Sequence, residues 1–346
     1  MRLDIPSLDE AAMAEARARQ NQLTKPPGSL GRLEELGVQL CGMAGCCPPP
    51  VPLRKAVLVF AGDHGVAAHG ISIAPSEVTR QMVLNFLSGG AGINVMARQA
   101  GARVTVVDAG VKSVLPPLRG LVIGKVAPGT GDISQGPAMT REQAQSAMEL
   151  GMRCVEAESA KGLDLLACGE MGIGNTTPAT AIVSVLTGRE PRGLTGPGTG
   201  IKGEALARKA ALIEMALAVN KPDPADALDL LAKVGGFEIA AMAGAMLKAA
   251  SLRVPVMVDG FIATASAMVA AVLNPAVKGY LIAGHRSAEP AHDTALAWLG
   301  LKPLLDLGMR LGEGTGAVLA MPVVETAAAV LRDMATFAEA GVRVET

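Results

Sequence analysis

Residues 163–178 read LDLLACGEMGIGNTTP, an apolar run that passes through a glycine and a glutamate into a glycine-rich turn. The run Leu163 to Ala167 has the length of a buried strand, and Pro178 suits the first position of a helix. A strand that leads directly into a helix is the unit from which α/β sheets are built. We therefore expect Thr177 to be the N-cap of this helix and the turn to lie at the carboxyl end of a strand.

The same pattern occurs at four other places along the chain. Each run is rich in Val, Leu and Ile and is followed within three residues by glycine and a charged residue; the runs are 56–61, 104–107, 254–258 and 280–283. Near-continuous apolar strands indicate a sheet that is buried on both faces. The stretches between them are rich in Ala, Leu and Met and predict helices over 82–99, 141–161, 178–186, 202–219 and 261–273. The fold class predicted is α/β, a doubly wound and mainly parallel sheet with flanking helices.

In such a sheet, ligands bind outside the carboxyl ends of the strands. The charged residues that fall there are Asp63, Asp108, Glu170, Asp259 and Arg286. We therefore expect the functional site to be built from the loops that carry them.

Helical patterns also occupy both ends of the chain, over 8–22, 30–43 and 324–339, and the run Pro48-Pro49-Pro50 marks the passage into the first strand. We expect a small helical domain built from both termini, made of residues 1–47 and 301–346. The segment 48–300 is then the α/β substrate-binding domain.

The composition argues against several classes of function. The chain has 31 basic and 32 acidic residues, so it has no strong electrostatic field to attract a polyanion. It has only five Phe, one Tyr and one Trp, and so lacks the aromatic side chains on which nucleic-acid binders stack bases. The amino terminus lacks the order of a signal peptide, and the apolar runs are too short to cross a bilayer. Five cysteines form no CxxC element, and no His-x-x-x-His pair exists. We expect a cytoplasmic protein that binds no nucleic acid, membrane or metal.

Two glycine-rich turns lead into predicted helices, at 169–178 and 195–200, and the second precedes Lys202 and Lys209. Free backbone N–H groups and the helix dipole at such positions attract anions. An ordinary tight turn explains the first segment as well, because Gly-x-Gly is common, and neither turn is a Walker A element. Two turns of this kind suit one phosphate and its sugar.

Glu313 stands among three glycines in Leu311-Gly312-Glu313-Gly314-Thr315-Gly316. This setting is poorly suited to a helix or a strand interior and favours a side chain held close to a ligand, where desolvation raises the pKa toward that of a general base. A surface turn is the alternative. We interpret Cys168 as a core thiol rather than a nucleophile, and the four histidines as hydrogen-bonding groups.

Five blocks of sequence are long enough to be compared with known families: LTKPPGSLG at 23–31, AGDHGV at 61–66, GEMGIGNTT at 169–177, GHRS at 284–287 and GEGTG at 312–316. Together they strongly resemble the nicotinate-nucleotide:dimethylbenzimidazole phosphoribosyltransferases of cobalamin biosynthesis. They span nearly the whole chain in the family's order. The resemblance implies an α/β domain with a smaller helical domain, assembled as a homodimer that needs no cofactor.

The resemblance also implies a reaction. The 5-phosphoribosyl group of nicotinate mononucleotide moves to a nitrogen of 5,6-dimethylbenzimidazole, which releases nicotinate and gives α-ribazole 5′-phosphate with inversion at C1′. The pyridinium leaving group becomes neutral as it departs, so no metal is required. Glu313 matches the family's general base, which accepts the proton of the second azole nitrogen. Glu170 matches a second carboxylate, placed either near C1′ or as an acceptor for a ribose hydroxyl.

The remaining site residues follow from motif matches. Those implied for the phosphate and ribose are Gly172, Gly174, Asn175, Thr176, Thr199, Gly200 and Lys209, with Ser287 contributed across the dimer. Those implied for the benzimidazole are Ser76, Gln81, Met171 and Leu311. Met and Leu side chains adapt to ligands of different shape, so the preferred base is left open.

Two other functions share parts of this pattern. A noncatalytic nucleotide-binding protein would keep the glycine-rich turns, but the presence of both Glu313 and Glu170 argues against it. A nicotinamide-dependent oxidoreductase would need a strand leading into Gly-x-Gly-x-x-Gly, with an acidic residue about 20 positions further on, and the sequence lacks this arrangement.

Overall fold

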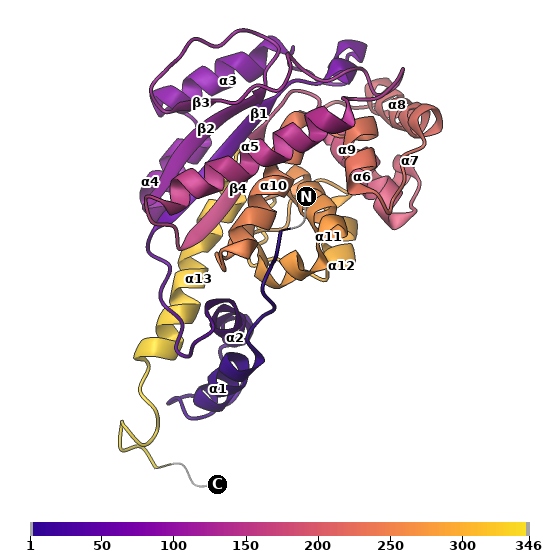
Figure 1. The fold of residues 1–346 in the computed structure, drawn as a ribbon. Coiled ribbons are helices and arrows are strands. Elements are labelled where there is room, and N and C mark those ends of the chain that lie inside the picture. Colours follow the sequence, from indigo (N-terminus) through magenta and orange to yellow (C-terminus); the bar gives the residue numbers. More distant parts are fainter. Residues whose placement is uncertain (1–2, 344–346) are drawn as a thin grey trace.

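A computed structural model describes residues 3–343 and contains one six-stranded sheet in which all neighbouring strands are parallel (Figure 1). The strands are β1 (Lys55–Gly62), β2 (Ala102–Gly110), β3 (Leu121–Ile123), β4 (Leu165–Met171), β5 (Val256–Val258) and β6 (Leu281–Ala283). Their order is β3-β2-β1-β4-β5-β6, so the direction of winding reverses between β1 and β4. This order confirms the predicted doubly wound α/β class.

Burial explains why the strands were recognisable. Every residue of β1 is buried, as expected of a central strand covered on both faces, and this produces a near-continuous apolar run. The strand missed by the sequence is β3, whose three residues are exposed or half-buried at the edge of the sheet. A strand this short carries too few residues for a recognisable pattern.

Helices cover both faces of the sheet (Figure 1). On one face, α4 (Gly92–Ala100) and α13 (Thr315–Asp333) contact each other and the strands. On the other face, α5 (Arg141–Ser159), α10 (Phe237–Ser251) and α11 (Phe261–Leu273) form a layer. Within that layer the backbones of α5 and α10 are in close contact. Gly151 permits this, since a Cβ at that position would overlap the carbonyl oxygen of Ala241.

Three predicted helices need correction. The single helix expected over 82–99 is two helices, α3 (Glu77–Ser88) and α4, because the chain turns at Gly89 with φ of 81°. The helix after β4, α6 (Thr176–Thr187), begins before Thr177, so that residue is not its N-cap. Pro178 is accommodated because its missing N–H lies in the first turn. The last helix is α13, which begins at 315 and ends at 333 rather than spanning 324–339.

Four helices were not predicted: α7 (Pro191–Leu194), α9 (Ala227–Val234), α10 and α12 (His292–Leu299). Nearly all of α10 is buried, so it is apolar all round and lacks the one-sided pattern that identifies a surface helix. The remaining elements are α1 (Glu10–Gln20), α2 (Arg32–Ala44) and α8 (Glu204–Asn220), with 3-10 turns η1 (Gly65–His69) and η2 (Pro275–Tyr280).

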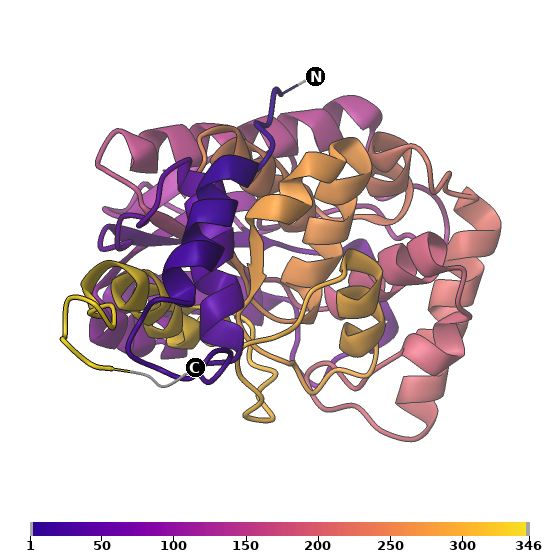
Figure 2. The same ribbon diagram turned by 90° about the horizontal axis from the view of Figure 1, so that it is seen from below.

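The helices from the two ends of the chain lie together. Figure 2 shows α1 and α2 beside α13, and a small apolar cluster joins them, made of Ala12, Ala16, Val38, Cys41 and Leu331. The guanidinium of Arg19 donates to the carbonyl of Leu331 over 2.6 Å. Since α13 also packs on α4, β4 and β5, the division at residues 47/48 and 300/301 stays a prediction.

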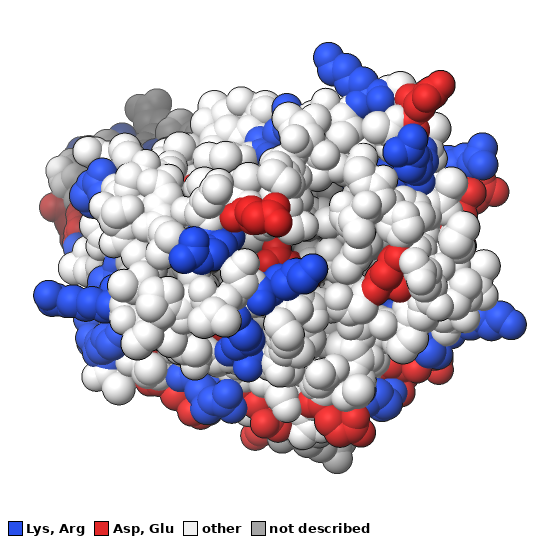
Figure 3. All heavy atoms as spheres, turned by 90° about the horizontal axis from the view of Figure 1, so that it is seen from above, with Lys and Arg blue, Asp and Glu red and all other residues white. Residues whose placement is uncertain are grey.

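By length and composition, α13 is apolar enough to span a membrane, which corrects the expectation that every apolar run is too short. More than half of this helix is buried inside the protein, as in the core helix of a globular fold. On the face seen in Figure 3, basic and acidic side chains are interspersed, in keeping with a net charge of -1.

Candidate active site

A cavity of about 300 Å³ opens at the carboxyl end of the sheet. Its walls come from the loops that follow β1, β4, β5 and β6, together with residues 198–199 and 310–312. This is the side of the winding reversal where doubly wound folds bind their ligands. Nine of the predicted site residues line it: Glu170, Met171, Gly172, Gly174, Asn175, Thr176, Thr199, Ser287 and Leu311.

Glu170 lies at the end of β4 and is buried in the cavity wall. The amide of Asn175 donates to its Oε2. Burial raises the pKa of Glu170 to about 8; the Asn175 hydrogen bond opposes this, while nearby Asp259 and Glu238 add to it. With only these neighbours, the side chain is therefore mainly protonated at neutral pH.

Glu313 lies in a backbone conformation that few residues adopt. Gly312, Glu313 and Gly314 have φ of 82°, 64° and 90°, all in the left-handed region, and only glycine adopts it without strain. The N–H of Glu313 donates to the carbonyl of Glu170 over 3.3 Å, so the two glutamates lie on adjoining segments. Holding a non-glycine residue in this way is typical of functional sites.

The carboxylate of Glu313 is fixed through one of its oxygens. Oε2 accepts from the N–H of Ile93 at the start of α4, over 3.0 Å, and Oε1 receives no hydrogen bond from residues 3–343. The side chain is 4 % exposed. Burial raises the pKa of Glu313, the Ile93 N–H opposes this, and Asp259 adds to it. Glu313 is therefore a buried carboxyl group with one free oxygen, next to the wall formed by Leu311 and Gly312.

A buried lysine lies behind another part of the cavity wall. Lys209 on α8 donates to Thr176 Oγ1 over 2.7 Å and to the carbonyl of Gly196 over 2.9 Å. Burial lowers the pKa of Lys209 to about 8, and Glu289 works in the opposite direction. Because Thr176 begins α6, the ammonium and the helix N-terminus converge on one place, which is a suitable setting for an anion.

The second glycine-rich turn closes this end of the cavity. The N–H of Gly198 donates to Glu289 Oε1 over 3.0 Å, and Arg310 donates to the carbonyl of Gly198 over 2.7 Å. Thr199 is linked to the loop after β1, since its Oγ1 accepts from the N–H of Ile73 over 3.1 Å and lies 3.0 Å from Ser72 Oγ. Four separate segments are thereby tied together around the mouth.

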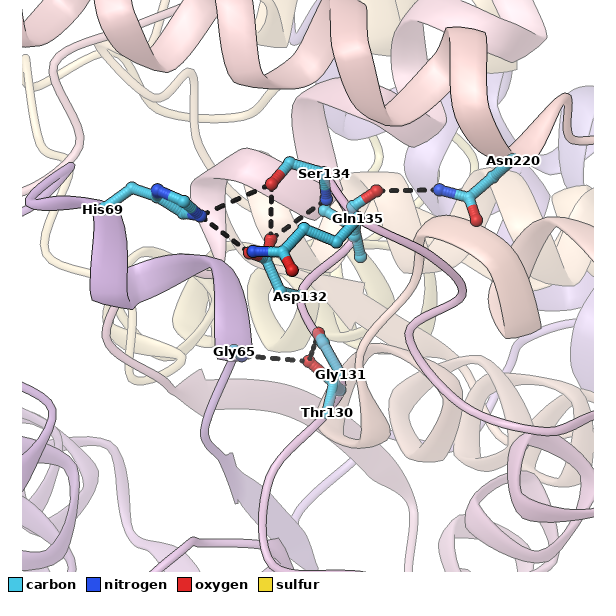
Figure 4. A network of polar contacts seen from close by, with 9 residues as sticks. Gly65, His69, Thr130, Gly131, Asp132, Ser134, Gln135 and Asn220 are labelled. Carbon is cyan, nitrogen blue, oxygen red and sulfur yellow. Dashed lines mark hydrogen bonds and ion pairs between the residues drawn. The ribbon is translucent and has the colours of Figure 1, made fainter.

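A polar network holds the loop after β1 in place (Figure 4). His69 Nε2 lies 2.7 Å from Asp132 Oδ2, and Ser134 Oγ donates to Asp132 Oδ1 over 2.7 Å. Burial acts to raise the pKa of Asp132, but the hydrogen bonds from His69 and Ser134 lower it overall. Nearby, the N–H of Gly65 donates to Thr130 Oγ1 over 3.3 Å. The network fixes the segment that leads to the cavity wall at 71–72.

Two of the other histidines, His64 and His292, also form hydrogen bonds, whereas neither ring nitrogen of His285 has a hydrogen-bond partner in the part of the chain that the structure describes. His64 Nε2 lies 2.8 Å from Glu238 Oε1 with both side chains buried; burial acts to lower the pKa of His64, but Glu238 raises it overall. His292 Nδ1 accepts from the N–H of Ser287 over 2.8 Å. Within residues 3–343, no group of three or more His, Cys, Asp or Glu side chains is arranged to hold a metal. Cys168 is fully buried and burial raises its pKa, as expected of a core thiol.

Comparison with known proteins gives the family. Residues 5–342 match the family described as phosphoribosyltransferase. The chain belongs to this family. It is 56 % identical over 338 residues to the nicotinate-nucleotide--dimethylbenzimidazole phosphoribosyltransferase of Desulforudis audaxviator, and 57 % identical over 338 residues to that of Chloroflexus aggregans. Each alignment covers 98 % of this chain and 96 % of the relative.

A solved structure agrees with these matches. The crystal structure of the phosphoribosyltransferase of the same name from Thermus thermophilus superposes with a TM-score of 0.93 at 47 % identity, covering 98 % of this chain and 100 % of that one. The resemblance found in the sequence is thus confirmed, and the protein is an enzyme of the nicotinate-nucleotide:dimethylbenzimidazole phosphoribosyltransferase family.

Five predicted site residues do not line the cavity of this phosphoribosyltransferase: Ser76, Gln81, Gly200, Lys209 and Glu313. Lys209 and Glu313 lie directly behind the lining. Lys209 donates a hydrogen bond to the lining residue Thr176, and Glu313 follows the lining residue Gly312 in the chain. Ser76 precedes α3 and Gln81 is exposed on it, so their contact with a ligand stays a prediction. Ser287 lines the cavity of its own chain, and a contribution across a dimer also stays a prediction.

Sequence reasoning missed Glu289 and Arg310 as residues of this cavity. Glu289 is buried, and burial raises its pKa while Lys209 opposes the shift. Neither residue lies in a glycine-rich turn, and each reaches Gly198 from a part of the chain about a hundred residues away, with separations of 91 and 112. The nearest signals in the sequence were the GHRS block, which ends two residues before Glu289, and the GEGTG block, which begins two residues after Arg310.

Proposed function

We propose that this phosphoribosyltransferase transfers the 5-phosphoribosyl group of nicotinate mononucleotide to 5,6-dimethylbenzimidazole, with inversion at C1′ and release of nicotinate. The observation that carries the proposal is the pair of buried glutamates, Glu170 and Glu313, joined by a backbone hydrogen bond beside a cavity with a buried lysine. The names of the relatives supply the two substrates.

Glu313 is the proposed general base. As one azole nitrogen bonds to C1′, the proton on the other becomes acidic, and a nearby carboxylate that accepts it prevents positive charge from accumulating. The anchored Oε2 and the free Oε1 suit this task, because the group is already fixed before the proton arrives. The raised pKa of Glu313 brings its basicity closer to that of the azole.

The phosphate is proposed to bind where Lys209, Thr176 and the turn at 196–200 meet. Gly172, Gly174 and Asn175 belong to the same glycine-rich entry to α6, whose N-terminus favours negative charge. A phosphate bound there would place a negative charge next to the Lys209 ammonium and favour its charged form.

Met171 and Leu311 are proposed to hold the azole, with Ser76 and Gln81 completing the pocket from α3. Both Met171 and Leu311 line the cavity, and Leu311 is 56 % exposed. An exposed leucine at a cavity mouth gives an apolar ring a surface to cover. We further propose that the enzyme acts as a cytoplasmic homodimer in which Ser287 also reaches the partner's site, and that it uses no cofactor.

The reaction is tested directly with nicotinate mononucleotide and 5,6-dimethylbenzimidazole in the presence of a chelator. We expect release of nicotinate that depends on the azole, and an α-ribazole 5′-phosphate product identified by the NMR coupling of its anomeric proton. Nucleotide binding without turnover would favour the noncatalytic alternative. Nicotinate release without azole would indicate a hydrolase instead.

Glu170 gives this proposal a second test, in proton release. Nicotinate mononucleotide carries a pyridinium cation, and a cation near Glu170 favours the ionised carboxylate of a group whose pKa is otherwise about 8. At pH 7 binding should release up to about one proton from this group. Calorimetry in buffers of different ionisation enthalpy measures the release, and Glu170→Gln is the reference. Equal proton release by the parent enzyme and this variant would remove Glu170 from the neighbourhood of the pyridinium ring.

A further inference from the structure

The loop that carries Glu313 is held by a carboxylate from a different strand. Asp259 directly follows β5 and is 2 % exposed. Its Oδ2 accepts from the N–H of Gly314 over 3.2 Å, and its Oδ1 accepts from the N–H of Ala317 over 2.9 Å. The N-cap residue of α13 is Gly314, which has no side chain to bond the free N–H groups of the first turn. Asp259 therefore supplies the cap that α13 cannot provide for itself.

The same end of α13 is pressed against β6. A Cβ on Gly316 would overlap the ring of His285, and a Cβ on Gly284 would lie 2.7 Å from the Cα of Ala317. His285 Nε2 in turn lies 3.6 Å from Asp259 Oδ1. The residues after β5 and β6 thus pack closely against the segment that follows Glu313.

The polar groups around Asp259 are of two kinds: groups that favour its negative charge, and carboxyl groups that its negative charge affects. The ring of His285 and the N–H groups of Gly260, Gly314 and Ala317 face it and favour its anion, against the effect of burial, which raises the pKa of Asp259 overall. The carboxyl groups of Glu313 and Glu170 are also near enough to Asp259 for its charge to act on them. For both glutamates burial is the main cause of a raised pKa, and the negative charge of Asp259 adds to it.

We propose that Asp259 is a positioning residue for the transfer reaction: its two hydrogen bonds hold the strained loop and thereby set the place of the Glu313 carboxylate. The inference rests on the proposed function, because it assigns a role to Asp259 only through the proposed base. Asp259 has two effects on Glu313, since it fixes the geometry of the loop and keeps a negative charge nearby.

Asp259→Asn tests both effects with little change in the size of the side chain. The amide oxygen can accept one of the two hydrogen bonds, while the NH₂ group meets the other N–H and cannot bond it. We expect kcat to fall about 10- to 100-fold, in line with a small misplacement of a catalytic group. The KM for nicotinate mononucleotide should change less than about threefold, because the phosphate end is untouched.

The pH profile distinguishes positioning from a purely structural role. Removing the negative charge of Asp259 lowers the pKa of Glu313, so the acid limb of kcat/KM should move to lower pH in Asp259→Asn. In a Glu313→Gln background the same substitution should cause no further loss, because the group it positions is gone.

Asp226→Asn is a matched control. Asp226 caps α9 by accepting from the N–H groups of Leu228 and Asp229, over 3.1 and 3.0 Å, and lies outside the cavity lining. Its substitution should leave kcat and the pH profile unchanged. Should Asp259→Asn not fold, Asp259→Ser carries the same test with a shorter neutral acceptor.

Three results would overturn the proposal: parental kcat with an unmoved acid limb, a full additional loss in the Glu313→Gln background, or failure of both Asp259 variants to fold. Absence of turnover in the parent enzyme would instead contradict the proposed function.

Discussion

Glu313→Gln is expected to lower turnover by about 10²- to 10⁴-fold, the usual contribution of a general base, while nucleotide binding is largely retained. Glutamine has nearly the same shape, and its amide oxygen can still accept from the N–H of Ile93. It cannot take up the azole proton, so positive charge builds up on the ring in the transition state. Single-turnover rates and calorimetric binding of nicotinate mononucleotide measure the two effects separately.

The pH dependence of the same variant gives a further check. Burial raises the pKa of Glu313, so in the parent enzyme the rate is lost as the pH falls through a value above the usual glutamate range. In Glu313→Gln this acid limb should be absent. Glu149→Gln makes the same chemical change on the exposed side of α5 and serves as the control. Parental turnover of Glu313→Gln at neutral pH would disprove the role of Glu313 as base.

The sequence predicted the sheet well because burial on both faces leaves a direct pattern. Five of the six strands, including residues 56–61 of β1, were visible as apolar runs ending in glycine and charge. The same burial concealed α10, since a helix that is apolar all round has no polar face to give it a period. The break between α3 and α4 depends on a positive φ at Gly89, and composition alone does not distinguish such a turn from a glycine tolerated within a helix.

The site was predictable where local chain chemistry decides it. Glycines on both sides of Glu313 indicated an unusual backbone, and the structure has three consecutive left-handed residues there. The partners of this loop were not predictable, because Ile93 and Asp259 bond it across 220 and 55 residues of sequence. No spacing rule connects such positions, since their contact depends on the order of the strands.

Gly169→Ala is expected to lower turnover about 100-fold, although residue 169 contacts no substrate in the proposed mechanism. Gly169 lies in β4, and a Cβ there would overlap the carbonyl group of Glu313 and lie 2.5 Å from the N of Gly314. The atoms that such a Cβ meets belong to the backbone of the loop, so no side chain can rotate to make room and the loop itself must move away from β4. The hydrogen bonds from the loop to Asp259 and Ile93 resist that movement. A shift of about 1 Å is enough to take a general base out of reach of its proton.

The same overlap should destabilise the fold by about 1 to 3 kcal/mol, the usual cost of overpacking a core. Gly136→Ala is the matched control, because a Cβ at that position meets nothing within 4 Å and its φ is not in the left-handed region. The decisive comparison is between kcat and stability, since a loop displaced from β4 lowers kcat even at temperatures where the variant is fully folded. If Gly169→Ala keeps parental kcat and melting temperature, β4 and the Glu313 loop are not in close contact, and the fixed position inferred for the base is wrong.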